Sequence, residues 1–159
     1  MIKALKKDSA PSDFRLWYND WVEENAFGVV LDVGKSQYWD YDFPTIDINK
    51  KLNPTFVGNI EKTDFADGTY DVVMCNGMYE CVDNPQKMVN EVMRILKPGG
   101  KAIFGFVGEG YKPYKKPWRF YKEGDIEFRG RIHSEQFIDV SADRKSQSNQ
   151  YHFIIVCKK

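Results

Sequence analysis

Three apolar stretches of this chain each end with an aspartate or an asparagine. Asp32 and Gly34 close the first stretch, Asp47 closes the second, and Asn76 and Gly77 close a later one. A carboxylate can accept hydrogen bonds from hydroxyl groups or pair with an ammonium group. Glycine lets a ligand approach the backbone closely. These residue types indicate a site for a polar small molecule that carries hydroxyl groups or charge.

The segment 29–34 begins like a nucleotide-binding loop, with an apolar strand, an acidic residue and a glycine. No glycine-rich turn follows it, and only twelve residues, 35–46, separate Gly34 from Asp47. A parallel crossover of helix and loops takes at least about 10–12 residues, so a full helix does not fit here. The sequence therefore predicts a shortened loop, without the helix N-terminus that would face an anion.

The elements that must position these residues are short apolar strands and two helices. Helical spacing of apolar residues covers about 11–27, and a second helix over 84–96 is ended by Pro98-Gly99-Gly100. The last two apolar runs flank a polar turn, which predicts a hairpin. Uninterrupted apolar runs, typical of buried parallel strands, lie at 28–33, 44–49, 55–60, 69–76 and 101–107, and the hairpin runs lie at 135–143 and 150–159.

This alternation predicts an α/β fold, a Rossmann-like doubly wound, mostly parallel sheet with a C-terminal antiparallel hairpin, in a three-layer αβα sandwich. We expect one domain over residues 1–159, with a helical segment at about 11–27, a core at about 28–106 and a loop and hairpin at about 107–159. In such sheets the ligand lies beyond the carboxyl ends of the strands, where the strand order reverses.

The composition excludes several classes of protein. Lys+Arg and Asp+Glu both total 23, so no general affinity for nucleic acid is expected. No apolar run approaches the roughly 18–20 residues of a membrane span, and the N-terminus has no signal-peptide pattern. The three cysteines have no paired or metal-ligand spacing, so we expect a cytoplasmic protein with reduced thiols and no metal.

An ordered series of motifs runs from residue 65 to residue 104. Residues 65–71 read Phe-x-Asp-x-x-Tyr-Asp, Glu80 follows after the next apolar run, and residues 96–100 read Leu-Lys-Pro-Gly-Gly. In this order and spacing the series resembles the class I S-adenosylmethionine-dependent methyltransferases. Cys81 stands where that family usually has histidine. The resemblance is close over about 29–106 and looser in the remainder.

The resemblance implies S-adenosylmethionine as cofactor and S-adenosylhomocysteine as product. Asp47 would accept the ribose hydroxyls, although it could instead only cap a turn. Asp32 would receive the ammonium of the methionine tail or merely stabilise the turn at Gly34. The remaining cofactor-side residues are Ile48 next to Asp47, Asn59 and Ile60 for the adenine, and Asn76, Gly77 and Met78 near the sulfonium, although Asn59 could belong to a plain turn. In place of the missing helix N-terminus, Lys35 could pair with the tail carboxylate, or it could be a solvated surface lysine.

A catalytic base is needed only when the methyl acceptor must lose a proton. Glu80 is the candidate that the family pattern places, and His133, in an expected loop, is a second. Aromatic and basic residues interleave over 111–122, which suits a sugar or a phosphate but could also brace the loop. The substrate-side candidates in this segment are Tyr111, Tyr114, Trp118 and Arg119.

Two functions follow from the sequence. The first is methyl transfer to a small molecule, with a sugar or glycan precursor as one acceptor class, because residues 113–124 resemble a motif of family members found among sugar-modifying proteins. The second is a non-catalytic binding or regulatory module with weakened cofactor binding. A nicotinamide-binding domain would need a Gly-x-Gly-x-x-Gly turn, which this sequence lacks. The oligomeric state is left open.

Overall fold

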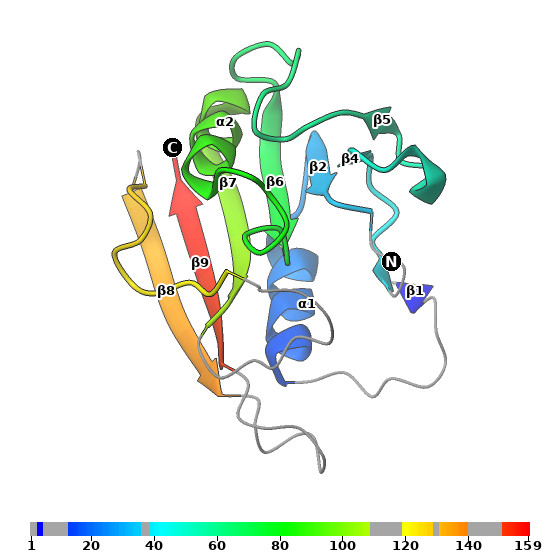
Figure 1. Ribbon diagram of the computed structural model, residues 1–159. Helices are drawn as coiled ribbons and strands as arrows, with labels where there is room; N and C mark the ends of the chain where they lie inside the picture. Colours follow the sequence, from blue (N-terminus) through cyan, green and yellow to red (C-terminus); the bar gives the residue numbers. More distant parts are fainter. Residues whose placement is uncertain (1–2, 5–12, 36–38, 109–118, 129–130, 140–150) are drawn as a thin grey trace.

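The structure is a computed structural model that describes residues 3–4, 13–35, 39–108, 119–128, 131–139 and 151–159. Its centre is a seven-stranded sheet made, in chain order, of β2 (Val30–Val33), β4 (Thr45–Asp47), β5 (Phe56–Val57), β6 (Tyr70–Asn76), β7 (Leu96–Val107), β8 (Arg131–Asp139) and β9 (Tyr151–Lys158). The spatial order is β5-β4-β2-β6-β7-β9-β8 (Figure 1).

The sheet is parallel from β5 to β7, and β9 runs antiparallel between β7 and β8. The strand order reverses between β2 and β6, which lie side by side in register from Val30 with Val72 to Val33 with Cys75. The expected C-terminal hairpin is confirmed as β8 and β9. Two short strands, β1 (Lys3–Ala4) and β3 (Trp39–Asp40), form a separate antiparallel pair.

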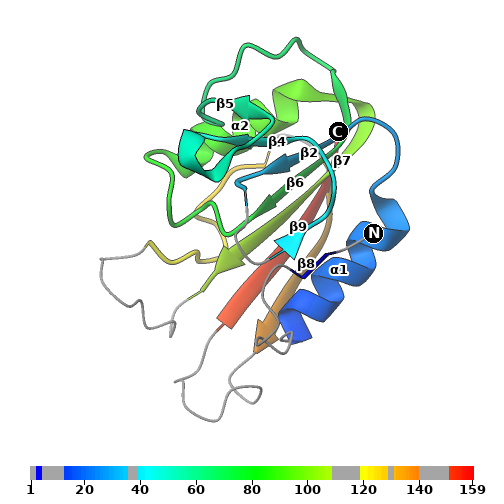
Figure 2. The same cartoon turned by 90° about the vertical axis from the view of Figure 1, so that its right-hand side faces the viewer.

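Two α-helices cover opposite faces of the sheet in the described part of the chain (Figure 2). Helix α1 (Asp13–Asn25) packs Tyr18 and Val22 on one face. Helix α2 (Pro85–Ile95) begins with Asn84 as N-cap, whose side chain accepts from the Lys87 N–H. Asn84 and the proline after it are a favourable helix start, because the Asn84 side chain satisfies a free backbone N–H and proline has no N–H to satisfy. The expected three-layer α/β architecture is confirmed.

The two faces of the sheet have separate hydrophobic cores, because successive side chains of each strand point to opposite faces. On the α2 face, Leu31, Val73 and Phe104 are fully buried with the apolar side of the helix. On the α1 face, Met74 and Ile103 are fully buried beneath Tyr18. Trp17 and Trp21, which belong to the apolar spacing of the helix expected at about 11–27, are only partly buried at the border of this core.

The Leu-Lys-Pro-Gly-Gly motif is the first part of β7 and not the end of the helix, since α2 stops at Ile95. A Cβ at Gly100 would lie 2.9 Å from the Lys97 carbonyl oxygen and 3.1 Å from the Asp71 carbonyl oxygen. Two backbone oxygens therefore exclude any side chain there. The Lys97 ammonium lies 2.9 Å from Asp71 Oδ2, which also accepts the Val29 N–H at 2.8 Å. These motif residues join the starts of β2, β6 and β7.

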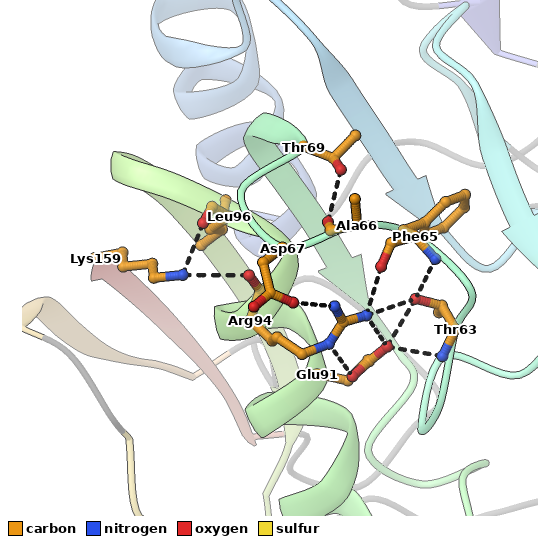
Figure 3. Close-up of polar contacts among 9 residues, drawn as sticks. All are labelled: Thr63, Phe65, Ala66, Asp67, Thr69, Glu91, Arg94, Leu96 and Lys159. Carbon is orange, nitrogen blue, oxygen red and sulfur yellow. Dashed lines mark hydrogen bonds and ion pairs between the residues drawn. The ribbon is translucent and has the colours of Figure 1, made fainter.

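A charged network ties the segment after β5 to α2 (Figure 3). Arg94 donates to Glu91 from Nε at 2.9 Å and from Nη2 at 2.7 Å, and to the Phe65 carbonyl oxygen at 2.8 Å. It also pairs with Asp67. Glu91 Oε1 accepts both the N–H and the hydroxyl of Thr63 at 2.7 Å. These contacts with Arg94 and Thr63 lower the pKa of Glu91 to about 2.

Removing this network should destabilise the fold and change its acid sensitivity. We expect Arg94→Ala or Glu91→Gln to lower the free energy of unfolding at neutral pH by about 1–3 kcal/mol, as loss of hydrogen bonds between charged, partly buried groups does. A carboxylate with a depressed pKa stabilises the fold above its unfolded pKa of about 4.3, and that contribution is lost as the pH falls toward about 2.

Urea unfolding of the wild type and the variants at neutral pH and at about pH 3 measures this contribution. The difference between wild type and Glu91→Gln should shrink on acidification. Asp64→Asn, at an exposed position of the same segment, is the control. Equal stabilities of wild type and Arg94→Ala at neutral pH would show that the network contributes nothing.

Two sequence expectations about loops have different outcomes. The connection from β2 to β4 contains no helix among the residues described, as predicted from its length. His133, expected in a loop, lies instead in β8, where the register with β9 shifts between Ile132 and Ser134. The strand extends past the apolar run because β9 pairs with β8 as far as Arg131. No helix in the described segments is long and apolar enough to cross a membrane.

Candidate functional site

The carboxyl ends of β2, β4 and β6 meet at one edge of the sheet, since these strands are parallel neighbours. Gly34 follows β2, Asp47 ends β4, and Asn76 ends β6 with Gly77 after it. The fold therefore brings together the residues that the sequence predicted to surround a ligand. This edge, at the reversal of strand order, is the candidate site.

Gly34 and Met78 join the ends of β2 and β6. Gly34 has φ +84, and a Cβ on it would lie 2.6 Å from the Met78 sulfur. A side chain at Gly34 would therefore suffer both backbone strain and a collision with the thioether. Gly77 has φ +68, and a Cβ there would meet no atom within 4 Å, so the space beside Gly77 is open.

Asp47 organises the shortened loop. Its Oδ2 accepts the Lys35 N–H at 2.9 Å and its Oδ1 accepts the Asn49 N–H at 2.7 Å. Each carboxylate oxygen has a second lone pair that can still accept a ligand hydroxyl. The carboxylate thus ties the start of the loop at Lys35 to the end of β4, and it uses the Lys35 N–H that an anionic ligand could otherwise receive.

Lys35 has a charged partner within the chain. Its Nζ lies 3.3 Å from Asp40 Oδ2, and both side chains are about three-quarters buried. The ion pair joins the loop after β2 to β3. The hypothesis that this ammonium pairs with the cofactor's carboxylate stays a prediction, and it requires Lys35 to serve a second anion.

Asp32 is a buried carboxylate on the α1 face, with 8% of its surface exposed. The carboxylate has no hydrogen-bond partner among the residues that the structure describes. Burial raises its pKa to about 7; the charges of Arg15 and Lys35 oppose the rise and Asp40 adds to it. A charged carboxylate in a buried position is costly, and a ligand that brings a cation to it reduces that cost.

The adenine-side residues lie at the ends of β4 and β5. Ile48 is 73% exposed beside Asp47, so it offers an apolar surface to a ring. Ile60 is 3% exposed and belongs to the core on the α2 face, so it presents almost no surface. Asn59 Oδ1 accepts the Glu61 N–H at 2.9 Å, an arrangement that forms a turn.

Glu80 connects the segment after β6 to the end of β7. Its Oε1 accepts the Val107 N–H at 2.8 Å, whereas its Oε2 is buried and accepts no hydrogen bond from any described residue. Burial raises the pKa of Glu80 to about 7, and backbone hydrogen bonds, including the one from Val107, oppose the rise. The second oxygen is shielded from solvent, so the described geometry favours a positioning role over direct contact with an acceptor.

Arg119 contacts backbone on the β6 side of the site. Its Nη1 donates to the Val82 carbonyl oxygen at 2.8 Å and to that of Tyr79 at 3.3 Å, and its Nη2 donates to that of Asp83 at 3.2 Å. These contacts support the bracing role that the sequence left open. The other substrate-side candidates, Tyr111, Tyr114 and Trp118, lie outside the described residues.

Residues near Asp32 were missed because α1 was interpreted only as a packing helix. The Tyr41 hydroxyl donates to Asn19 Oδ1 at 2.5 Å and accepts from Arg15 Nη1 at 3.1 Å. The available signal was the spacing of Arg15 three residues before Tyr18, which places both on one helix face.

Among the described residues, no three His, Cys, Asp or Glu side chains are grouped so as to hold a metal ion.

Comparison with known proteins relates this site to a family. Residues 26–104 match the family model described as a methyltransferase domain. An uncharacterized protein of Methanocaldococcus jannaschii is 37% identical over 72 residues, which are 42% of this chain and 35% of that protein. A ubiquinone biosynthesis O-methyltransferase of Vibrio parahaemolyticus is 30% identical over 95 residues, which are 58% of this chain and 40% of that enzyme. The matched region thus spans less than half the length of these relatives.

The fold has close structural counterparts. The crystal structure of an S-adenosylmethionine-dependent methyltransferase from Methanosarcina mazei superposes with a TM-score of 0.60 over 87% of this chain and 96% of that one. The sequence identity is 16%, so this likeness concerns the fold alone.

Proposed function

Because this chain belongs to the class I S-adenosylmethionine-dependent methyltransferase family, we propose that it transfers a methyl group to a small-molecule acceptor. The observation that carries the proposal is the buried Asp32 carboxylate in β2, whose charged form is disfavoured by burial, with a pKa raised to about 7. A buried carboxylate with a strongly raised pKa at this position is a candidate partner for a ligand's cation.

The site residues fit the three parts of the cofactor. Asp47 would accept hydrogen bonds from the ribose hydroxyls, Asp32 would pair with the ammonium, and the exposed Ile48 would lie against the adenine. The open space beside Gly77 leaves room at the end of β6. When bound, S-adenosylmethionine supplies a methyl group on a sulfonium, from which a neutral thioether departs as a good leaving group.

The protein's own contribution to such a reaction is proximity and orientation. An in-line displacement needs the acceptor atom held close to the methyl carbon, and positioning of this kind can account for a large part of the rate. The loop ordered by Asp47 and the segment held by Glu80 fix the two sides of the edge. We propose a sugar or glycan precursor as the first acceptor class to screen.

A specific observation favours a second function, a methyltransferase-like module without catalysis. The Met78 sulfur packs on Gly34, and Asp47 already binds two backbone N–H groups. Groups of this chain thus already occupy part of the space and part of the hydrogen-bonding capacity of the candidate site. In this function the domain would bind a partner and would bind the cofactor weakly or not at all.

Calorimetric titration with S-adenosylmethionine and S-adenosylhomocysteine separates the two functions. Dissociation constants in the micromolar range, about −8 kcal/mol, are expected for the enzyme. NAD serves as the control nucleotide, because the chain lacks the turn that seats a pyrophosphate. Absence of binding by both sulfur compounds at millimolar concentration would leave only the non-catalytic module.

A further inference from the structure

The segment between β6 and α2, residues 77–84, is tied to three other parts of the chain by charged side chains, two from outside the segment and one of its own. We call it the β6 turn. Glu80 within it binds the Val107 N–H at the end of β7. Glu61, from the segment after β5, accepts the N–H of Asp83 at 3.0 Å and that of Asn84 at 2.7 Å. Arg119, after β7, binds the other side of the turn.

Arg119 is the contact that spans most of this turn. Its guanidinium binds the carbonyl oxygens of Tyr79, Val82 and Asp83 and lies 5.9 Å from the centre of the Tyr79 ring. Three oxygens held by one planar group fix the path of the backbone between them, because the guanidinium donors have a rigid geometry. A lysine could satisfy these oxygens only partly.

The β6 turn also lines the proposed cofactor site. Met78 lies on Gly34, and the open space beside Gly77 belongs to the proposed cofactor position. Burial raises the pKa of Cys81, and the charges of Glu80 and Asp47 add to the rise, which places the turn within electrostatic reach of the proposed ribose ligand. A displacement of the turn would therefore move atoms at the cofactor.

We propose that Arg119 is a positioning residue for the cofactor site: it holds the β6 turn from the segment after β7 and so sets the affinity for S-adenosylmethionine. This inference rests on the proposed function. It gives Arg119 a role without contact to either substrate, and it makes the segment after β7 a part of the cofactor site's framework.

Cys81 provides a probe of the turn that requires no ligand. It is the exposed cysteine, whereas Cys75 and Cys157 are buried. Its thiol lies 3.6 Å from the Gly77 carbonyl oxygen, within the turn. A chromogenic aromatic disulfide exchanges with the thiolate and releases a coloured thiolate, so the rate of colour formation reports how freely the turn moves.

The test combines this rate with calorimetry on wild type, Arg119→Ala, Arg119→Lys and Lys87→Ala. We expect Arg119→Ala to accelerate the reaction of Cys81 severalfold and to weaken S-adenosylmethionine binding roughly tenfold, since small displacements at a site are costly. Arg119→Lys should fall between wild type and Arg119→Ala. Lys87→Ala, which removes an exposed positive charge from α2, should match wild type.

The outcomes are distinguishable. Unchanged affinity and unchanged Cys81 reactivity in a folded Arg119→Ala protein would overturn the inference and leave the proposed function intact. Absence of cofactor binding by the wild type would overturn the proposed function and the cofactor part of this inference together. If Arg119→Ala does not fold, the intermediate values expected of Arg119→Lys decide, and wild-type values in that variant would overturn the inference.

Discussion

Asp47→Ala is expected to weaken S-adenosylmethionine binding by roughly 100-fold or more. A hydrogen bond to a charged group contributes about 1.5–3 kcal/mol, and about 1.4 kcal/mol corresponds to a factor of ten in affinity. The proposed ribose contact supplies two such bonds. The substitution also releases the N–H groups of Lys35 and Asn49, which the carboxylate holds at 2.9 and 2.7 Å.

The effect should be specific to this carboxylate. Asp47→Asn should lose nearly as much affinity, because an amide nitrogen cannot accept the backbone N–H that one carboxylate oxygen accepts. Asp64→Ala removes an exposed carboxylate away from the sheet edge and should bind as the wild type does. Calorimetric affinity of Asp47→Ala within twofold of wild type would show that Asp47 only shapes the loop.

Asp32→Asn is expected to change how the stability of the ligand-free protein depends on pH. The folded pKa of Asp32 is raised from 3.8 to about 7 by burial. Between these values the unfolded chain releases the proton that the folded chain retains, so stability falls as the pH rises through this window. Above about pH 7 the full destabilisation is present.

The size of this effect has an upper bound of about 4 kcal/mol, because each of about three pH units corresponds to about 1.4 kcal/mol. We expect the asparagine variant to be more stable than wild type at pH 8, by roughly 1–4 kcal/mol, and to lose most of that advantage near pH 4. The same variant should bind S-adenosylmethionine more weakly, since a neutral amide pairs poorly with an ammonium.

Denaturant unfolding across this pH range, without ligand, measures the difference between Asp32→Asn and wild type. Arg15, Lys35 and Asp40 are the charged groups that act on Asp32, and they remain in both proteins. Glu80 has a raised pKa and changes stability in the same direction, so only the difference isolates Asp32. A difference that stays constant from pH 4 to pH 8 would contradict the prediction.

The strands and α2 could be predicted because their signals are local. Uninterrupted apolar runs such as Val30–Val33 become buried parallel strands, and Asn84 and Pro85 give a clear helix start. The short connection between Gly34 and Asp47 excluded a helix by length alone. The convergence of Asp32, Gly34 and Asp47 followed from the rule that parallel strands end at one edge.

The unpredicted features are contacts between distant segments. Nothing near Arg119 in the sequence indicates that its guanidinium binds carbonyl oxygens about 40 residues earlier, at Tyr79 and beyond. Helical spacing predicted α1, but it could not show that Tyr18 would be fully buried while Trp17 stays at the border. The prediction that His133 lies in a loop was wrong, because the pairing of β8 with β9, rather than the composition of β8, sets where that strand begins.

The helix-free connection after β2 has a consequence for ligand selectivity under the proposed function. The amino-acid tail of the cofactor would meet a partner for its ammonium at Asp32, while the row of free N–H groups that usually receives its carboxylate is absent from the described connection. Lys35, the nearby cation, is already engaged by Asp40. Such a site recognises its ligand by the positively charged ammonium group and by the ribose. It should therefore bind decarboxylated S-adenosylmethionine far more tightly than a neutral nucleoside thioether.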